Sequence, residues 1–213
     1  MPVLTRAVAR RLQADGECDS TLASSSVFAL RDAVTHKAEA VWASRGGVDV
    51  YTDAARAATS TPEVDHILEV QFAETALVRA FRAEPRARAD SLATAVCAAE
   101  LRDALNAVGN LNVTSRRVNQ GKKGPFTAAL RRLDDDRLRT VSLEQLARQG
   151  RAKSLVDDGT WARIERTVVV AYDGLEDRAH DDAGGWCALP AANTLATAAV
   201  HELGAMLAAL GVE

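Results

Sequence analysis

Apolar residues recur every three or four positions along most of this chain, the spacing that gathers them on one face of an α-helix. The helices that this spacing predicts cover about residues 4–14, 26–44, 72–83, 89–106, 160–173 and 190–210. Gly46 and Gly47 end the second of them, and Ser142 with Gln145 has the spacing of a capping box at a further short helix. Abundant alanine and few aromatic residues, 4% of the chain, also favour a mainly helical protein.

Three short segments alternate between apolar and polar residues, which is the pattern of a β-strand. They are Val48–Tyr51, Glu63–Ile67 and Leu111–Ser115. Pro62 favours extended backbone in the residue before it, at the entry to the second segment. The fold class that we predict is therefore mainly α with a small α+β core.

The residues after the third strand segment carry conflicting helix signals. Ser115 can cap a helix that begins at Arg116, but Gly121, Gly124 and Pro125 follow soon after. Proline is favoured in the first turn of a helix and disfavoured in its interior. We therefore expect the first helix to be short and a new one to begin at Pro125.

The size and charge of the chain limit its organisation and its partners. Its 213 residues, 47% of them hydrophobic, can bury the core of a single domain over residues 1–213. A formal net charge of -3 argues against a general nucleic-acid coat protein. The stretch from Gly109 to Leu133 nevertheless contains no acidic residue, which predicts a local positive surface. Its basic residues are Arg116, Arg117, Lys122, Lys123, Arg131 and Arg132.

The cysteines are Cys18, Cys97 and Cys187, which are far apart and never in CxxC spacing. We therefore expect no disulfide framework and no structural zinc, and a reducing compartment such as cytoplasm or nucleus. No run approaches eighteen uninterrupted apolar residues, so we expect no membrane span. The first residues include several arginines without a long apolar centre, which disfavours a secretory signal.

Two separated stretches carry the residue types that phosphodiester hydrolysis needs: an activated water, a cation near the phosphate and a stabilised leaving oxygen. His66 can accept a proton near neutral pH, and Asp65 offers a carboxylate to a cation. In the second stretch Asn119 offers a carboxamide oxygen, and Lys122, one helical turn later, can hold a phosphate oxygen. These oxygen ligands, completed by water, suit one Mg²⁺ or Mn²⁺ ion.

The side chains of Asp65 and His66 are expected to point to opposite faces if their backbone is extended, because successive residues of a strand alternate. Both can serve one site only if the backbone bends or if the two groups approach the site from different sides.

At these residues the chain resembles the HNH endonucleases, the ββα-metal nuclease family. The shared pattern is DHI from Asp65, NL from Asn110, a second asparagine nine residues later and a lysine three residues after that. The resemblance implies that His66 is the general base and that Asp65 and Asn119 are the metal ligands. It also implies that Asn110 braces the loop holding the base and that Lys122 contacts phosphate.

This sequence departs from the family pattern in three ways. Ser115 and Val118 stand where many relatives have a zinc-binding CxxC, and Glu69 replaces a frequent proline, with Gln71 close behind. Glu69 could tune the site or form a salt bridge. The 44 residues between Asp65 and Asn110 are many more than in compact members. The organisation that we expect is an HNH-like core over 63–124, a helical insertion over about 72–106, and helical flanks over 1–58 and 125–213.

The function expected from this resemblance is metal-dependent cleavage of nucleic acid, with DNA favoured over RNA, and with Arg116, Arg117 and Lys123 as further phosphate contacts. The alternative is a catalytically inactive HNH-like module that binds nucleic acid or protein. A purely structural Asp-His pair in a helical scaffold is a third interpretation. Asp134–Asp136 and His180 are interpreted as solvated residues, not as metal ligands. The sequence leaves the oligomeric state open.

Overall fold

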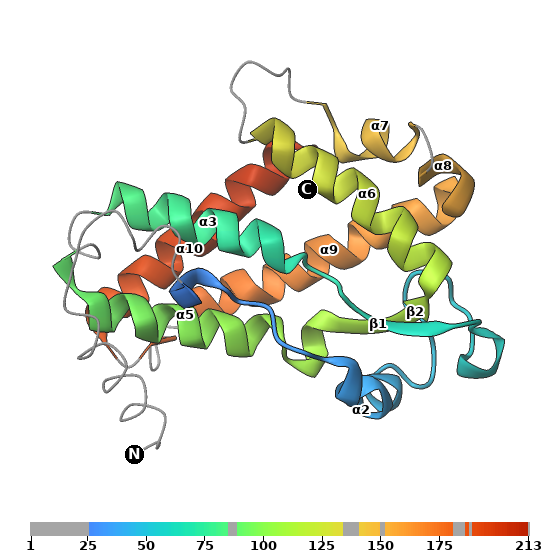
Figure 1. Ribbon diagram of the computed structural model, residues 1–213, viewed down its shortest axis with the longest axis horizontal. Coiled ribbons are helices and arrows are strands. Elements are labelled where there is room, and N and C mark those ends of the chain that lie inside the picture. The colour runs from blue at the N-terminus through green and yellow to red at the C-terminus, as the bar shows by residue number, and fades with distance from the viewer. Residues whose placement is uncertain are drawn as a thin grey trace.

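The computed structural model describes residues 26–84, 89–133, 141–149, 152–180, 186–187 and 189–212 (Figure 1). Within these ranges the protein is mainly helical and contains one small antiparallel sheet, which confirms the predicted class. The helix predicted over 4–14, Cys18 and the acidic run Asp134–Asp136 lie outside the described residues.

Four of the helices pack together beside the sheet (Figure 1). They are α3 (Val70–Ala83), α5 (Ser91–Leu105), α9 (Asp158–Ala179) and α10 (Pro190–Ala209). Helix α10 packs against the other three, because its apolar residues recur at helical spacing. The predicted inward-facing residues Leu195, Ala199, Leu203 and Met206 are all buried. The sequence pattern therefore identified this core correctly.

Strands β1 (Pro62–His66) and β2 (Leu111–Ser115) form the sheet, with Val64 opposite Val113 and His66 opposite Leu111. Helices α3 and α5 occupy the chain between the two strands. Helix α6 (Arg116–Leu133) follows β2 directly and packs on both strands. We call β1, β2 and α6 the ββα unit.

Shorter helices connect these elements. They are α2 (Ala38–Ser44), α7 (Leu143–Ala147) and α8 (Ala152–Leu155), with 3-10 turns at Ser26–Phe28, Thr35–Lys37, Arg56–Ala58 and Val108–Asn110. Helix α7 begins with the predicted capping box, in which the Ser142 hydroxyl accepts from the backbone of Gln145 and the Gln145 side chain accepts from the backbone of Ser142.

The two faces of the sheet differ in polarity. Directly opposed residues share a face, so Val64, His66, Leu111 and Val113 lie on one side. This side is apolar apart from His66, and Val41 and Trp42 of α2 pack against it. The apolar face fixes the register of the two strands, because a shift by one residue would expose it.

The other face of the sheet is polar and also covered. Asn112 and Thr114 point from it to the buried carboxylate of Asp49, which accepts hydrogen bonds of 2.7 and 2.8 Å from them. Asp65 and Glu63 lie on the same face, toward α6. Burying polar groups is unfavourable unless they are paired, so this face is where the fold departs from simple hydrophobic packing.

The predicted helix over 26–44 is wrong in its first half. Between its two 3-10 turns the chain from Ala29 to Val34 is not helical, and Leu30 is fully buried. The N–H of Leu30 donates to Glu74 at 2.8 Å, and Arg102 donates to the carbonyl of Ala29 at 2.5 Å. These long-range bonds replace the helical ones. The strand predicted at Val48–Tyr51 is also absent from the described sheet, since only a single bridge joins Val48 to Ala55.

Helix α6 runs through the predicted break, with Pro125 in its interior. Its buried side, which includes Val118 and Phe126, continues across the proline, so packing outweighs the missing hydrogen bond. Gly121 is needed for this packing. A Cβ at Gly121 would lie 2.3 Å from Cγ2 of Val156, whereas a Cβ at Gly124 would meet no atom within 4 Å apart from its chain neighbours and the backbone of its own helix.

This contrast predicts unequal effects of one added methyl group at two positions of the same helix. We expect Gly121→Ala to lower the free energy of unfolding by about 1–3 kcal/mol, because the methyl group overpacks the contact with Val156. We expect Gly124→Ala to change it by less than about 1 kcal/mol, because the helical preference of alanine is offset by the crowding of its Cβ against Pro125. Urea unfolding of both variants measures these changes. Equal effects would show that α6 does not approach Val156 as closely as described.

Candidate functional site

Lys122 of α6 extends to the polar face of the sheet and is fully buried. Its Nζ donates to Oδ2 of Asp65 and to Oε1 of Glu69, both at 2.9 Å, and to the backbone carbonyl of His66. An ammonium group has three protons, so each of these acceptors receives one. Lys122 therefore faces the protein interior and not, as the resemblance implied, a phosphate in solvent.

Asp65 is held from two sides. The hydroxyl of Tyr51 donates to Oδ2 at 2.9 Å, and Lys122 donates to the same oxygen. Burial raises the pKa of Asp65 to about 6, against the lowering effect of the Lys122 ammonium. Burial alone would lower the pKa of Lys122, but Asp65 and Glu69 outweigh this effect and raise it. At neutral pH the cluster thus contains a charged lysine.

The role of Glu69, open from the sequence, is to form an ion pair. It precedes α3, is 5% exposed, and accepts from Lys122. Its second oxygen lies 3.7 Å from the half-exposed guanidinium of Arg31. We call Tyr51, Asp65, Glu69 and Lys122 the Lys122 cluster. Tyr51 was not singled out in the sequence, because a tyrosine in a short alternating segment resembles ordinary core.

His66 occupies the opposite face of the sheet from Asp65, as alternation along an extended strand requires. The imidazole is 2% exposed, and its Nε2 lies 2.9 Å from Oδ1 of Asn106. Burial lowers the pKa of His66, which favours the neutral ring. Asn106 was also overlooked in the sequence, because an asparagine at the end of a helix is common.

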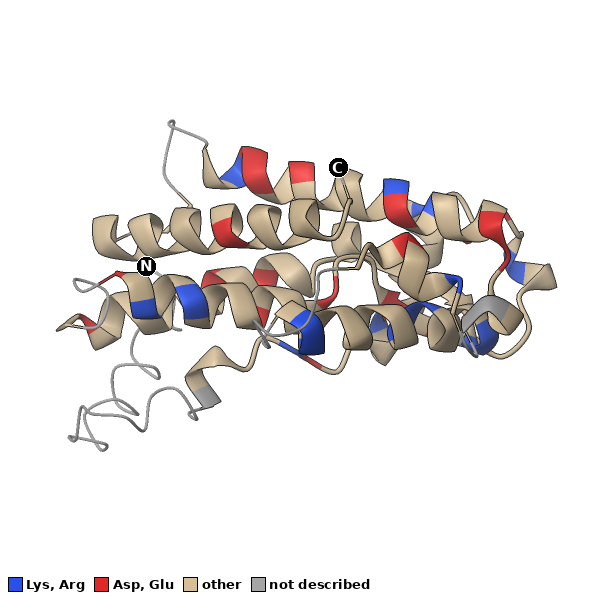
Figure 2. Cartoon of the chain, turned by 90° about the horizontal axis from the view of Figure 1, so that it is seen from above, with Lys and Arg blue, Asp and Glu red and all other residues tan. Residues whose placement is uncertain are grey.

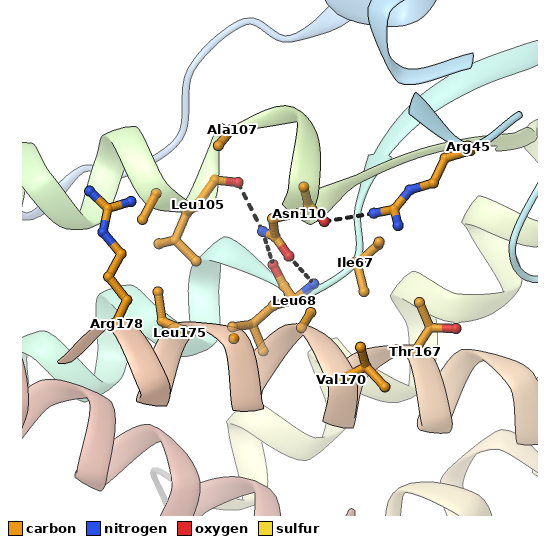
Figure 3. A pocket seen from close by; sticks show the side chains of 14 residues that line it. Arg45, Ile67, Leu68, Leu105, Ala107, Asn110, Thr167, Val170, Leu175 and Arg178 are labelled. Carbon is orange, nitrogen blue, oxygen red and sulfur yellow. Dashed lines mark hydrogen bonds between the residues drawn. The ribbon is translucent and has the colours of Figure 1, made fainter. Parts of the chain in front are cut away.

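Asn110 holds the turn that follows His66 (Figure 3). Its side-chain oxygen accepts from the N–H of Leu68 at 2.8 Å, and its side-chain nitrogen donates to the carbonyl of Leu105 at 2.8 Å. Its own carbonyl accepts from the N–H of Ile67 at 2.8 Å. These bonds join the end of β1 to the end of the segment before β2.

A pocket of about 260 Å³ lies next to this turn, between it and α9 (Figure 3). Ile67, Leu68 and Asn110 line one wall, and Arg45 and Arg178 lie toward its two ends. Asp65 and His66 are not among its lining residues. The hollow is therefore adjacent to the candidate site but is not formed by its titratable groups.

Asn119 is half-buried on α6 and pairs with Glu63 instead of Asp65. Its Nδ2 donates to Oε2 of Glu63 at 2.9 Å, which leaves the other carboxylate oxygen 3.5 Å from Arg116. Glu63 and Asp65 are two residues apart on one face of β1, and their partners Asn119 and Lys122 are three residues apart on α6. Glu63 is thus an acid beside the site that the sequence pattern did not single out.

The remaining predicted basic contacts have different surroundings. The side chain of Arg116 is 64% exposed and Lys123 is also exposed, whereas Arg117 donates to the carbonyls of Ser154 and Leu155 at 2.9 and 3.0 Å. Figure 2 shows basic and acidic segments interspersed in that view. Arg116 and Lys123 therefore present their charges to solvent on α6, whereas Arg117 serves partly to hold α8.

The donors available to a metal ion are chemically suitable but sparse. Asp65 and Asn119 offer carboxylate and carboxamide oxygens, which suit Mg²⁺ or Mn²⁺. Among the described residues, no group of three or more His, Cys, Asp or Glu side chains converges as a metal cluster. A cation held by these residues would keep most of its ligands as water, and it would share Asp65 with Lys122.

Comparison with known proteins adds no assignment: no family model, curated protein or solved structure matches the chain. In the portion of the chain that the structure covers, every helix is too short or too polar to traverse a bilayer.

The Lys122 cluster predicts that substitutions of two adjacent lysines change the free energy of unfolding by very different amounts. We expect Lys122→Met to lower the free energy of unfolding by about 3–5 kcal/mol, because it leaves Asp65 and Glu69 buried without their cation. We expect Lys123→Met, at the exposed neighbouring position, to change it by less than about 0.5 kcal/mol. Urea denaturation measures both.

A triple variant separates the effect of charge from the effect of packing. Combining Lys122→Met with Asp65→Asn and Glu69→Gln removes both uncompensated carboxylates and should recover most of the stability. A triple variant as unstable as Lys122→Met alone would contradict the ion-pair explanation.

Proposed function

We propose that this protein is a metal-dependent endonuclease of the HNH type, which hydrolyses phosphodiester bonds with His66 as general base. The observation that carries the proposal is the ββα unit itself. It carries four of the five motif residues on β1 and α6, with Asn110 directly before β2, although α3 and α5 separate the two stretches of chain. Asp65, Asn119 and Lys122 lie on one side of the sheet, and His66 lies on the other. A buried polar face with a histidine on its reverse is an arrangement that hydrophobic packing alone does not call for.

The proposed cation is one Mg²⁺ or Mn²⁺, held by Asp65 and Asn119 and completed by water. When bound, it would neutralise negative charge on the phosphate. The chain's own residues prepare this donor set. Tyr51 and Lys122 hold one oxygen of Asp65. Lys122 therefore acts on the site by orienting Asp65 and the His66 backbone, a different role from the phosphate contact that the resemblance implied.

His66 is proposed to take a proton from the attacking water, with its imidazole reaching the site from the opposite face of the sheet to Asp65. Burial favours its neutral form, which is the form that a general base needs. Asn110 supports this role by fixing the turn after His66 through Leu68. The exposed Arg116 and Lys123 are proposed to contact the phosphate backbone, and DNA is the proposed substrate. We also propose a reducing, intracellular setting, because Cys97 and Cys187 are free thiols.

One observation favours a second function, that of an inactive HNH-like module that binds nucleic acid or protein. Asp65, His66 and Lys122 are each less than a tenth exposed, and Lys122 already neutralises Asp65. Cleavage requires that water and substrate reach His66, whereas binding through α6 does not. The two functions are therefore separated by whether activity depends on His66.

The cleavage experiment compares two histidines. We expect the wild-type protein to cut plasmid DNA with Mg²⁺ or Mn²⁺ and to stop when EDTA is added. His66→Ala should reduce the rate by about 10²–10⁴-fold, the usual contribution of a general base. His201→Ala, at an exposed position on α10, should leave the rate unchanged. Parallel assays on single-stranded DNA and on RNA test the substrate class. Cleavage that survives His66→Ala, or no cleavage of any substrate, would contradict the proposal.

The binding function makes a separate prediction for the surface of α6. The double variant Arg116→Gln, Lys123→Gln should weaken DNA binding and reduce the slope of log K against log salt by about 0.9 for each phosphate that the protein no longer neutralises. The matched control is Arg148→Gln, Arg166→Gln, which removes two exposed cations, one at the end of α7 and one on α9. Fluorescence anisotropy across a salt series measures both. Equal weakening by the two pairs would show that α6 is not the binding surface.

A further inference from the structure

We infer that Asn106 is a positioning residue for His66, which fixes the imidazole with its proton on Nε2 and leaves Nδ1 as the proton-accepting nitrogen. The inference rests on the proposed function, in which His66 is the base. Asn106 immediately follows α5, so it belongs to the insertion between the strands and not to the ββα unit. No motif singled out in the sequence includes it.

The carboxamide of Asn106 is 2% exposed and makes four hydrogen bonds. Its Nδ2 donates to the carbonyls of Leu30 and Arg102, both at 2.7 Å. Its Oδ1 accepts from the N–H of Asp32 at 3.1 Å and lies 2.9 Å from Nε2 of His66. The group thus connects the end of α5, the segment before α2 and the imidazole.

These partners fix which atom of the amide is oxygen. The carbonyls of Leu30 and Arg102 can only accept, so the atom facing them is nitrogen. The N–H of Asp32 can only donate, so the atom facing it is oxygen. Both constraints give the same orientation, in which Oδ1 faces His66. An amide oxygen carries no proton, so the proton of this hydrogen bond belongs to Nε2 of His66.

The placement of this proton decides the chemistry of the ring. In a neutral imidazole only one nitrogen carries a proton, so Nδ1 holds the lone pair. Asn106 occupies the Nε2 side, and the water that loses its proton must approach at Nδ1. An asparagine holds the ring in this state without contributing a charge, unlike a carboxylate partner.

NMR spectroscopy tests the inference without reference to activity. Long-range ¹H–¹⁵N spectra of the full chain, labelled at histidine, report the tautomer of each ring, and the His66 signal is identified by its loss in His66→Ala. At about pH 8, above the ordinary histidine pKa of about 6.5, we expect the Nε2-protonated tautomer. The Nδ1-protonated tautomer would overturn the inference, whatever the activity of the protein.

A variant pair adds a kinetic measurement. Asn106→Leu keeps a similar side-chain volume but offers no hydrogen-bond acceptor, so the His66 ring should no longer be held in a single tautomer. We expect kcat to fall by about tenfold to a hundredfold with KM unchanged, a smaller loss than in His66→Ala. Asp103→Ala, at an exposed position on α5, should leave the His66 tautomer and kcat unchanged. An unchanged tautomer and kcat in folded Asn106→Leu would overturn the inference.

The two proposals fail separately. A wild-type protein that shows the Nε2-protonated tautomer but cleaves nothing supports the placement of the proton and contradicts the proposed function. If Asn106→Leu does not fold, the wild-type tautomer alone decides the inference.

Discussion

The ββα unit depends on the hydrogen bonds that the buried ammonium of Lys122 donates. This ammonium joins α6 to the carboxylate of Asp65, to Glu69 at the start of α3, and to the backbone of His66. One buried cation thereby fixes three groups at the end of β1 and the start of α3, each more than fifty residues from it in sequence. Buried charges are unfavourable when isolated, so the arrangement is stable only while all its members are present.

The helical part of the fold follows from the sequence because each long helix has its own apolar period. Residues such as Leu195 and Leu203 repeat at helical spacing, and their burial needs no knowledge of the partner helix. The strands at Glu63–Ile67 and Leu111–Ser115 were predicted nearly to their observed bounds for a similar, local reason. Predictions failed where distant contacts decide the conformation, as at Leu30, whose backbone bonds to Glu74.

The motif residues of the candidate site could be singled out in the sequence, but their hydrogen-bond partners could not. The pairing of Asp65 with Lys122 and of Asn119 with Glu63 depends on how α6 crosses β1, which no local pattern encodes. Tyr51 and Asn106 come from segments with no motif, and both bond to motif residues across long sequence separations. Alternation did predict that Asp65 and His66 would face opposite ways. The sheet therefore separates a charged side from the side that carries the imidazole.

The insertion between β1 and β2 also constrains the order of folding. Two strands separated by so long a segment gain their ladder only after its ends have met, and closing a long flexible loop is entropically costly. Helices α3 and α5 pack on α10, and Asn110 holds Leu68 where this insertion begins and ends, so their assembly would bring the two strands together. We therefore expect the two strands to pair after the helices have assembled, and a change that loosens α10 to delay strand pairing without touching either strand.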